Sequence, residues 1–202
     1  MTRRGRVFVV SSPSGGGKTT AIKRLRRRMR TLARSVSLTT RAPRHGERHG
    51  RDYRFVSAAE FRRRRRAGQL LEWARVHDAY YGTPARPVRE TLVRGRDVIL
   101  SIDVQGARQV RRVLGADAVL IFLLPPSMRD LRQRLLRRRT ESRAAIAQRL
   151  AAAARELICA SWYDHRVVND RLDRTVRELQ RIIETYRRET TKGAGRHGAS
   201  AD

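Results

Sequence analysis

The sequence predicts an α/β protein in which a mostly parallel β-sheet is flanked by helices. Three short runs, at residues 7–10, 98–102 and 119–124, are rich in Val, Ile, Leu and Phe, as expected of buried strands. Between them lie segments whose apolar residues recur every three or four positions, which is the spacing of one helical face. Strands that alternate with helices usually run parallel and are covered on both faces, so we expect one layered sheet.

The first strand leads into a candidate phosphate-binding loop. Residues 12–19 match the pattern G-x-x-x-x-G-K-[ST], except that its first glycine is Ser12. Glycines let backbone N–H groups close around phosphate oxygens, and the N-terminus of the following helix adds partial positive charge. We expect Lys18 to reach the β- and γ-phosphates of a nucleotide and Thr19 to bind Mg²⁺. The alternative is an ordinary glycine-rich turn that precedes a helix.

The chain after this helix alternates between short strands, helices and polar loops. Its alternating apolar residues, capping residues and glycines predict, in order, a strand at 35–40, a polar loop at 39–53, a strand at 53–56, a helix at 57–68, a strand at 70–76, a turn at 80–84 and a helical segment around 88–92. The strand at 70–76 carries the carboxylate of Glu72 among apolar neighbours. The next buried strand ends at Asp103. The carboxylate of Asp103 and the phosphate loop both follow the carboxyl end of a strand, so we expect them at the same edge of the sheet.

The C-terminal half returns to longer helices. Its pattern predicts helices at 106–113, from Ser127 through Leu135, and around 146–157, then a short strand at 167–168 and a last helix capped by Asn169 or Asp170. The segment 137–143 is too polar for a core and is expected to form a flap. Residues 192–202 are small and polar and are expected to fray.

Length and composition indicate one folded domain. The chain has 202 residues, 40% of them hydrophobic, which is enough to build a core. Cys159 is the only cysteine, so no internal disulfide is expected. No apolar run is long enough to cross a bilayer and no leader sequence opens the chain, so we expect a cytoplasmic protein without a membrane partner.

The net charge of +28 raises the alternative of a nucleic-acid-binding protein. Only three of the 47 basic residues are lysines, and the arginines are spread over nearly every helical segment, opposite the apolar face. Aromatic residues make up only 5% of the chain, which leaves few rings for stacking on bases. We therefore interpret most arginines as solvated surface charges, expect no specific nucleic-acid partner, and expect long-range attraction of anionic nucleotides.

Several further motifs, in a fixed order, resemble those of the guanylate kinases, a family of P-loop nucleoside monophosphate kinases. They are Ser-Val-Ser-Leu-Thr-Thr-Arg-Ala-Pro-Arg-His-Gly-Glu at 35–47, Gly-Arg-Asp-Tyr-Arg-Phe-Val-Ser at 50–57, Leu-Glu-Trp-Ala at 71–74, Tyr-Gly-Thr at 81–83, Ile-Asp-Val-Gln-Gly-Ala at 102–107 and Val-Asn-Asp at 168–170. The resemblance covers residues 5–188. It implies Mg²⁺-dependent transfer of the ATP γ-phosphate to GMP and dGMP, giving GDP and ADP, in purine nucleotide metabolism.

The resemblance also implies a domain organisation. We expect one domain over residues 1–190, with a P-loop NTPase-type parallel sheet, a small mixed GMP-binding insertion at about 35–96 and an arginine-rich lid at about 134–150. Residues 191–202 are then a polar tail. The oligomeric state stays open.

The same resemblance assigns roles to individual residues. ATP is expected to contact Ser12, Pro13, Ser14, Gly15, Gly16, Gly17, Lys18, Thr19 and Asn169. GMP is expected to contact Ser37, Arg41, Arg44, Tyr53, Glu72, Tyr81, Thr83 and Asp103. Catalysis of the transfer is expected from Lys18, Arg44, Arg134, Arg138 and Arg149. In this scheme the arginines bind and neutralise phosphate oxygens, and Glu72 accepts hydrogen bonds from guanine N1–H and the 2-amino group.

Three departures and three alternative functions accompany the resemblance. Ser12 replaces the first loop glycine, Ser101 stands where the family carries a second acidic residue, and Arg139 replaces a flap glycine. The alternatives are a related kinase that phosphorylates a sugar phosphate, a catalytically inactive scaffold that binds phosphorylated partners, and the nucleic-acid-binding protein considered above. The loop at 39–44 with Glu72 argues against the first, and the presence of Lys18 argues against the second.

Overall fold

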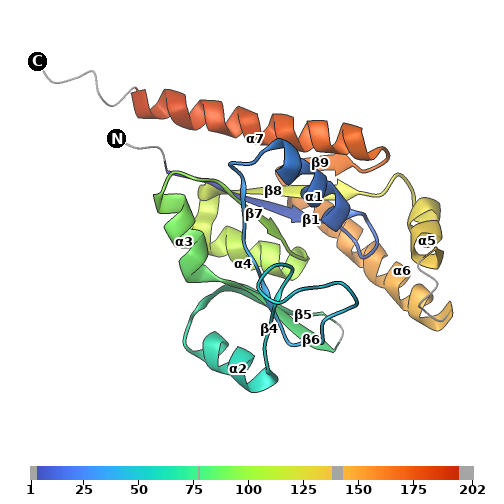
Figure 1. The fold of residues 1–202 in the computed structure, drawn as a ribbon. Helices are drawn as coiled ribbons and strands as arrows, with labels where there is room; N and C mark the ends of the chain where they lie inside the picture. Colours follow the sequence, from blue (N-terminus) through green and yellow to red (C-terminus); the bar gives the residue numbers. More distant parts are fainter. Residues whose placement is uncertain (1–3, 77, 138–142, 196–202) are drawn as a thin grey trace, which may run out of the picture.

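A computed structural model describes residues 4–76, 78–137 and 143–195 of the chain (Figure 1). At its centre is a five-stranded sheet in the order β2-β7-β1-β8-β9, and all neighbouring strands in it are parallel. Its strands are β1 (Val7–Ser11), β2 (Ala33–Arg34), β7 (Val98–Ser101), β8 (Ala118–Leu124) and β9 (His165–Val168). The parallel sheet predicted from the sequence is therefore confirmed.

Helices cover both faces of this sheet because the side chains of β1 alternate between two apolar cores. Phe8 and Val10 belong to the core that α1 (Lys18–Arg28) and α7 (Leu172–Gly195) cover. Val7 and Val9 belong to the opposite core, which is covered by α3 (Ala85–Val93) and α4 (Val104–Leu114). In Figure 1 α7 lies along the sheet and crosses α1. The loops that follow β1 and β7 leave the sheet at the same edge.

A second, four-stranded sheet in the order β4-β3-β6-β5 lies beside the central one, below it in Figure 1. Its strands are β3 (Leu38–Thr39), β4 (Arg54–Phe55), β5 (Leu70–Val76) and β6 (Ala79–Pro84), and α2 (Ala58–Arg66) connects β4 with β5. Strands β3 and β4 are parallel, while β6 is antiparallel to both β3 and β5. This mixed sheet is the region that the sequence assigned to the insertion at 35–96.

The turn predicted at residues 80–84 is wrong, because these residues form β6. Tyr80 and Tyr81 are good strand formers, and the Tyr80 ring stacks on Phe61 of α2 with their centroids 5.4 Å apart. Gly82, which suggested the turn, pairs with Leu38 and Trp73 on the neighbouring strands. A Cβ at residue 82 would lie only 3.0 Å from Leu70. Close packing between strands, and not the geometry of a turn, therefore explains the glycine at this position.

Two helices form a separate arm beside the sheet. They are α5 (Met128–Leu136) and α6 (Arg143–Ile158), and they pack through Leu131, Leu135 and Ile146. Short 3₁₀ helices occupy Gly115–Asp117 and Cys159–Trp162. Residues 138–142 of the predicted flap and residues 196–202 lie outside the described residues, while α7 continues through Gly195 into the segment expected to be a tail. In the described part of the chain, no helix is both long and apolar enough to cross a membrane.

Candidate active site

The loop between β1 and α1 has the backbone of a phosphate-binding loop. Gly15 and Gly17 adopt φ values of 87° and 88°, a left-handed conformation that favours glycine. A Cβ at Gly17 would lie 2.4 Å from Nδ2 of Asn169, so the loop backbone packs directly against the side chain of Asn169. Ser12 is tolerated because it is buried and its hydroxyl donates to the carbonyl of Pro13, at 3.2 Å.

Lys18 links this loop to the end of β7. Its Nζ donates to the carbonyl oxygen of Ile102 at 2.8 Å. Burial lowers the pKa of Lys18, while the carboxylates of Asp103, Glu156 and Glu72 act in the opposite direction. The Asp103 carboxylate caps α4 by accepting the N–H of Gly106 at 2.9 Å. The structure therefore brings the predicted Lys18 and Asp103 to one edge of the sheet.

Glu72 is a buried carboxylate in the lining of a small cavity. It is only 3% exposed, and it accepts a hydrogen bond from the Thr83 hydroxyl at 2.5 Å. Burial raises the pKa of Glu72 from 4.5 to about 7, with hydrogen bonding to Thr83 opposing this shift. A Cβ at Gly106 would lie 2.4 Å from Glu72 Oε2, so the N-terminus of α4 closes against the carboxylate.

The cavity around Glu72 has a volume of about 210 Å³ and joins the predicted acceptor and donor residues. Its lining comes from the phosphate loop, β5, β6 and the end of β7, and includes Ser12, Ser14, Lys18, Ser37, Tyr53, Glu72, Tyr81 and Asp103. Three carboxylates, of Glu72, Asp103 and Glu156, and a lysine converge there with several hydroxyl groups. Such a lining suits a ligand that carries both hydrogen-bond donors and phosphate.

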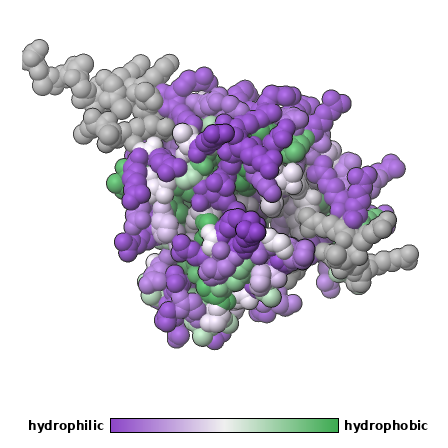
Figure 2. Space-filling model, in the orientation of Figure 1, coloured by the Kyte–Doolittle hydropathy of each residue, from purple (hydrophilic) through white to green (hydrophobic). Residues whose placement is uncertain are grey.

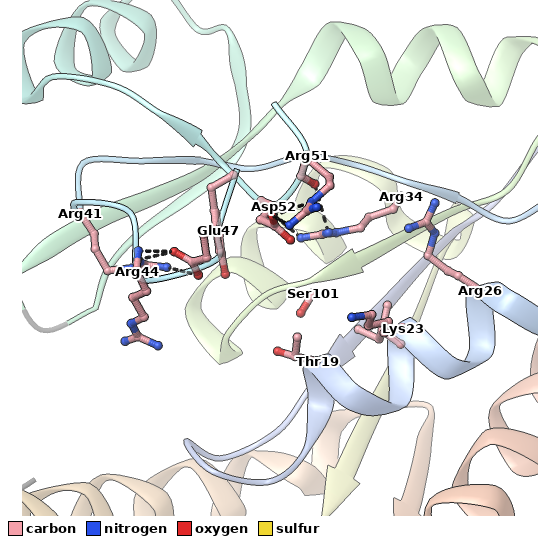
Figure 3. A pocket seen from close by; sticks show the side chains of 12 residues that line it. Thr19, Lys23, Arg26, Arg34, Arg41, Arg44, Glu47, Arg51, Asp52 and Ser101 are labelled. Atoms are coloured by element: carbon pink, nitrogen blue, oxygen red, sulfur yellow. Dashed lines mark hydrogen bonds and ion pairs between the residues drawn. The ribbon is translucent and has the colours of Figure 1, made fainter. Parts of the chain in front are cut away.

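Arg41 and Tyr81 lie together, as predicted, but Arg41 is already engaged by an acid. Its guanidinium makes two hydrogen bonds to the carboxylate of Glu47, at 2.8 and 2.9 Å, and one to the Tyr81 hydroxyl, at 3.1 Å. The hydrogen bonds between Arg41 and Glu47 raise the pKa of the guanidinium and lower that of the carboxyl. Figure 3 shows this pair at one side of a cleft of about 1010 Å³.

Arg44 and Tyr53 complete the same wall of the cleft. Glu47 accepts the backbone N–H of Arg44 at 2.8 Å, while the Arg44 guanidinium extends away from that carboxylate in Figure 3. The Arg41 guanidinium lies 5.3 Å from the centroid of the Tyr53 ring. Burial raises the pKa of the Tyr53 hydroxyl, so it stays a proton donor. Glu47 thus orders this loop, and it was present in the quoted motif without being assigned a role.

The arm formed by α5 and α6 contacts the phosphate loop through arginines. Arg149 of α6 donates to the Ser14 hydroxyl at 3.2 Å. Arg134 of α5 donates to the carbonyl of Asn169 at 2.8 Å, and the Asn169 amide donates to Gly16 at 2.6 Å. The Asn169 amide therefore holds the loop, while its side-chain oxygen accepts the Thr175 hydroxyl of α7 at 3.0 Å; the sequence had offered either Asn169 or Asp170 as the cap of this helix. Arg138, the remaining predicted lid arginine, lies outside the described residues.

Glu156 is a residue of this site that the sequence did not single out. It follows Arg149 by two helical turns on α6 and lines the cavity near Lys18. Burial raises the pKa of its carboxyl, and Lys18 opposes that shift. Its position two helical turns after Arg149, on the same face of the helix, was the signal in the sequence that could have identified it. Gly106 was likewise quoted within a motif, but its contact with Glu72 becomes visible only in the folded chain.

Thr19 lines the large cleft at the start of α1, opposite Arg41 and Arg44, as Figure 3 shows. A hydroxyl oxygen is a suitable ligand for Mg²⁺, which usually retains water and binds substrate phosphates besides one or two protein oxygens. Within the described ranges no group of three or more His, Cys, Asp or Glu residues could hold a metal ion.

The comparisons with known proteins agree with these geometric findings. The profile of the family described as guanylate kinase matches residues 4–186. The guanylate kinase of Geobacter sulfurreducens is 46% identical over 183 residues, which are 91% of this chain and 90% of that protein. The guanylate kinase of Rubrobacter xylanophilus is 50% identical over 181 residues, covering 90% of this chain and 94% of that protein.

A solved structure shows the same fold. The crystal structure of guanylate kinase from Anaplasma phagocytophilum aligns with a TM-score of 0.78 and 34% sequence identity, covering 92% of this chain and 87% of that one. The likeness confirms the predicted P-loop NTPase-type fold. By sequence and by structure, the chain belongs to the guanylate kinases, the family of nucleoside monophosphate kinases that phosphorylates GMP with ATP.

Proposed function

We propose that the chain performs this phosphoryl transfer with GMP in the cavity around Glu72 and the ATP phosphates on the loop at residues 12–19. The observation that carries the proposal is the buried Glu72, which is 3% exposed and held by Thr83 in the lining of that cavity. Guanine presents N1–H and a 2-amino group, two donors that one carboxylate can accept together. Adenine presents a bare N1 acceptor in that position, so it would face an unpaired buried carboxylate.

The acceptor phosphate is assigned to Arg41, Arg44, Tyr53 and Tyr81, with Ser37 and Thr83 near the base. Arginine forks match phosphate oxygens through charge-assisted hydrogen bonds and would hold the acceptor in line with the donor. The carboxylate of Glu47 already accepts two hydrogen bonds from the Arg41 guanidinium. A phosphate that binds Arg41 would therefore either displace this carboxylate or use the remaining N–H donors of Arg41. The exposed Arg44 guanidinium is available to take part.

The donor phosphates are assigned to the backbone of the loop, to Lys18, and to Arg134, Arg138 and Arg149 of the arm. Phosphoryl transfer requires positioning and neutralisation of oxygen charge rather than a covalent intermediate. Mg²⁺ is expected to enter with ATP, on the Thr19 hydroxyl, and would neutralise phosphate charge there. Asn169 holds Gly16, so it would act on the donor side by shaping the loop.

A nucleotide panel tests the proposal. ATP and Mg²⁺ are supplied with GMP, dGMP, AMP, CMP or UMP, and formation of the diphosphate is measured. We expect turnover with GMP and dGMP, and a kcat/KM for AMP lower by about 10⁴, because a site built on hydrogen bonds rejects an analogue that lacks them. Lys18→Ala should remove turnover without unfolding the chain. Rapid turnover of GMP by Lys18→Ala, or equal use of AMP, would overturn the assignment.

A further inference from the structure

We propose that Lys23, Arg26 and Arg34 form a second anion-binding subsite in the large cleft, which accepts a multiply charged phosphate-type anion such as inorganic pyrophosphate. All three side chains line the cleft of about 1010 Å³ that Arg41 and Arg44 also line. Figure 3 shows them on the opposite side of the cleft from Arg41 and Arg44, with Thr19 and Ser101 between the two groups. The subsite is thus separate from Arg41 and Arg44, which are assigned to the GMP phosphate. This assignment of Arg41 and Arg44 rests on the proposed function, whereas the subsite itself does not.

The acids of this cleft are committed to other partners. Glu47 accepts two hydrogen bonds from Arg41. Asp52 accepts the side chain of Arg51 at 2.8 Å and the backbone N–H of Arg48 at 2.9 Å. Asp52 attracts Arg34 only at longer range, where Arg34 also lowers the pKa of that carboxyl. In the described part of the chain, no carboxylate forms an ion pair with Lys23, Arg26 or Arg34.

Arg34 is already positioned for a ligand. Its two terminal nitrogens donate to the backbone carbonyls of Arg51, at 3.3 Å, and Asp52, at 2.8 Å. These carbonyls orient the guanidinium without removing its charge. An oriented donor loses less entropy when an anion binds, so it favours binding more than a free side chain would.

Arg26 and Arg34 are close enough to repel each other. Partial desolvation by its neighbours lowers the pKa of Arg26, and the positive charge of Arg34 lowers it further. An anion held between two like charges relieves that repulsion in addition to forming its own contacts. The neighbouring α1 arginines Arg24 and Arg28 differ in this respect, because both pair with Asp173.

The surrounding groups favour a phosphate-type ligand. Ser101 and Thr19 add hydroxyl donors to the cleft. Ser101 is uncharged, so it does not oppose an anion there. Arginine forks and hydroxyls together are the donor set that tetrahedral oxyanions accept. The assignment departs from the view that the arginines of α1 are merely solvated surface charges.

Calorimetric titration with inorganic pyrophosphate, without metal and at constant ionic strength, tests the subsite. Lys18→Ala serves as the background, because pyrophosphate also fits the phosphate loop. Arg26→Gln on this background should weaken pyrophosphate binding by about fivefold or more, as loss of one charge-assisted contact does. Lys23→Gln should weaken it in the same direction. Arg26 and Lys23 are exposed, so neither change is expected to unfold the chain, which circular dichroism checks.

Arg27→Gln is the matched control, since Arg27 lies on the same helix, is exposed and does not line the cleft. It should leave the binding constant unchanged. Equal weakening by Arg26→Gln and Arg27→Gln would show a general effect of net charge and overturn the subsite. Unchanged binding in Arg26→Gln and Lys23→Gln would overturn it as well. Neither result affects the proposed phosphorylation of GMP, which the nucleotide panel tests without these variants.

Discussion

Individual residues of the site combine burial with charge. Glu72 is 3% exposed, yet the structure gives it one strong hydrogen bond, from Thr83, and a close backbone approach at Gly106. An acid that is buried with unfilled acceptor capacity is costly to keep ionised. Two donors from a guanine base would fill that capacity and stabilise the carboxylate. The free energy that burial costs in the empty site is therefore partly recovered on binding, and only by the base that fits.

Glu72→Gln should weaken the use of GMP and narrow the preference for GMP over AMP. The amide offers one acceptor oxygen, and it places an N–H donor beside the guanine donors. The measurement is kcat/KM for both nucleotides in the wild type and the variant, at fixed ATP and Mg²⁺. The variant should unfold at no lower temperature at pH 8, because it removes a buried charge. An unchanged ratio of GMP to AMP in a folded variant would mean that Glu72 does not contact the base.

The pKa of about 7 for Glu72 predicts a pH-dependent affinity for GMP. Below this pH the carboxyl is protonated, and it then offers guanine fewer acceptor sites. The kcat/KM for GMP should therefore fall as the pH decreases through about 7 in the free enzyme, and should be flatter in Glu72→Gln. Since folding raises this pKa, the same group should also lower the stability of the free protein as the pH rises from about 4.5 to about 7. If the wild type and Glu72→Gln had the same pH dependence of kcat/KM, the first expectation would be contradicted. The same pH dependence of their stability would contradict the second.

At the scale of elements, α6 is the part that joins the arm to the phosphate loop. Arg149 contacts Ser14, and Glu156, two turns later, faces Lys18. The helix thus presents an arginine and a carboxylate to the loop from one face. On the other side of the loop, Asn169 at the end of β9 holds Gly16. The loop is therefore positioned by two separate elements that are distant from it in the sequence.

Arg149→Ala should lower kcat more than it raises the KM for GMP. Arg149 donates to Ser14 of the donor loop, so its charge should matter most during transfer. Steady-state kinetics with varied GMP at saturating ATP measures the two constants. Arg155→Ala, which removes an exposed arginine of the same helix, is the control and should change neither constant. A change confined to the KM for GMP would make Arg149 an acceptor-binding residue instead.

At the scale of the whole molecule, α7 is fastened across the central sheet by a buried acid. Asp97 precedes β7 and is 1% exposed; it accepts the backbone N–H of Arg6 at 2.9 Å and the side chain of Arg187 at 2.7 Å. One carboxylate therefore joins the start of the chain, the start of β7 and the last helix. Most other charges lie outside: Figure 2 shows a face dominated by hydrophilic side chains, with small hydrophobic areas between them. A net charge of +28 distributed in this way favours solubility and attraction of anionic substrates.

Asp97→Ala should lower the free energy of unfolding by about 3 kcal/mol, because it leaves buried donors without an acceptor. Denaturant unfolding followed by circular dichroism measures the change. Glu90→Ala, which breaks the exposed pair of Arg86 and Glu90 on α3, should have no measurable effect. If both variants lose the same stability, the position of Asp97 beneath α7 is not what makes it important.

Local patterns predicted most of the elements and supplied candidates for the site residues. The apolar run before residues 12–19 and the spacing of Ile22 and Leu25 behind them predicted β1, the loop and α1, because strand and helix each have a period that side chains reveal. The order of the motifs indicated the family, and the family indicated Glu72, Arg41 and Lys18 as candidate site residues. Tyr80 to Pro84 was the failure, because a glycine in a strand and a glycine in a turn look alike until the neighbouring strand is known.

What only the tertiary structure decided is which of these groups meet and in what state. Arg41 was expected to be free for phosphate, but its fork holds Glu47, and no local pattern distinguishes those partners. The pKa of Glu72, the closure of Gly106 against it, and the approach of Glu156 to Lys18 all depend on segments that are far apart in the sequence. The physical reason is that residue spacing specifies local geometry, whereas burial and electrostatic interactions depend on the distances between elements after they pack.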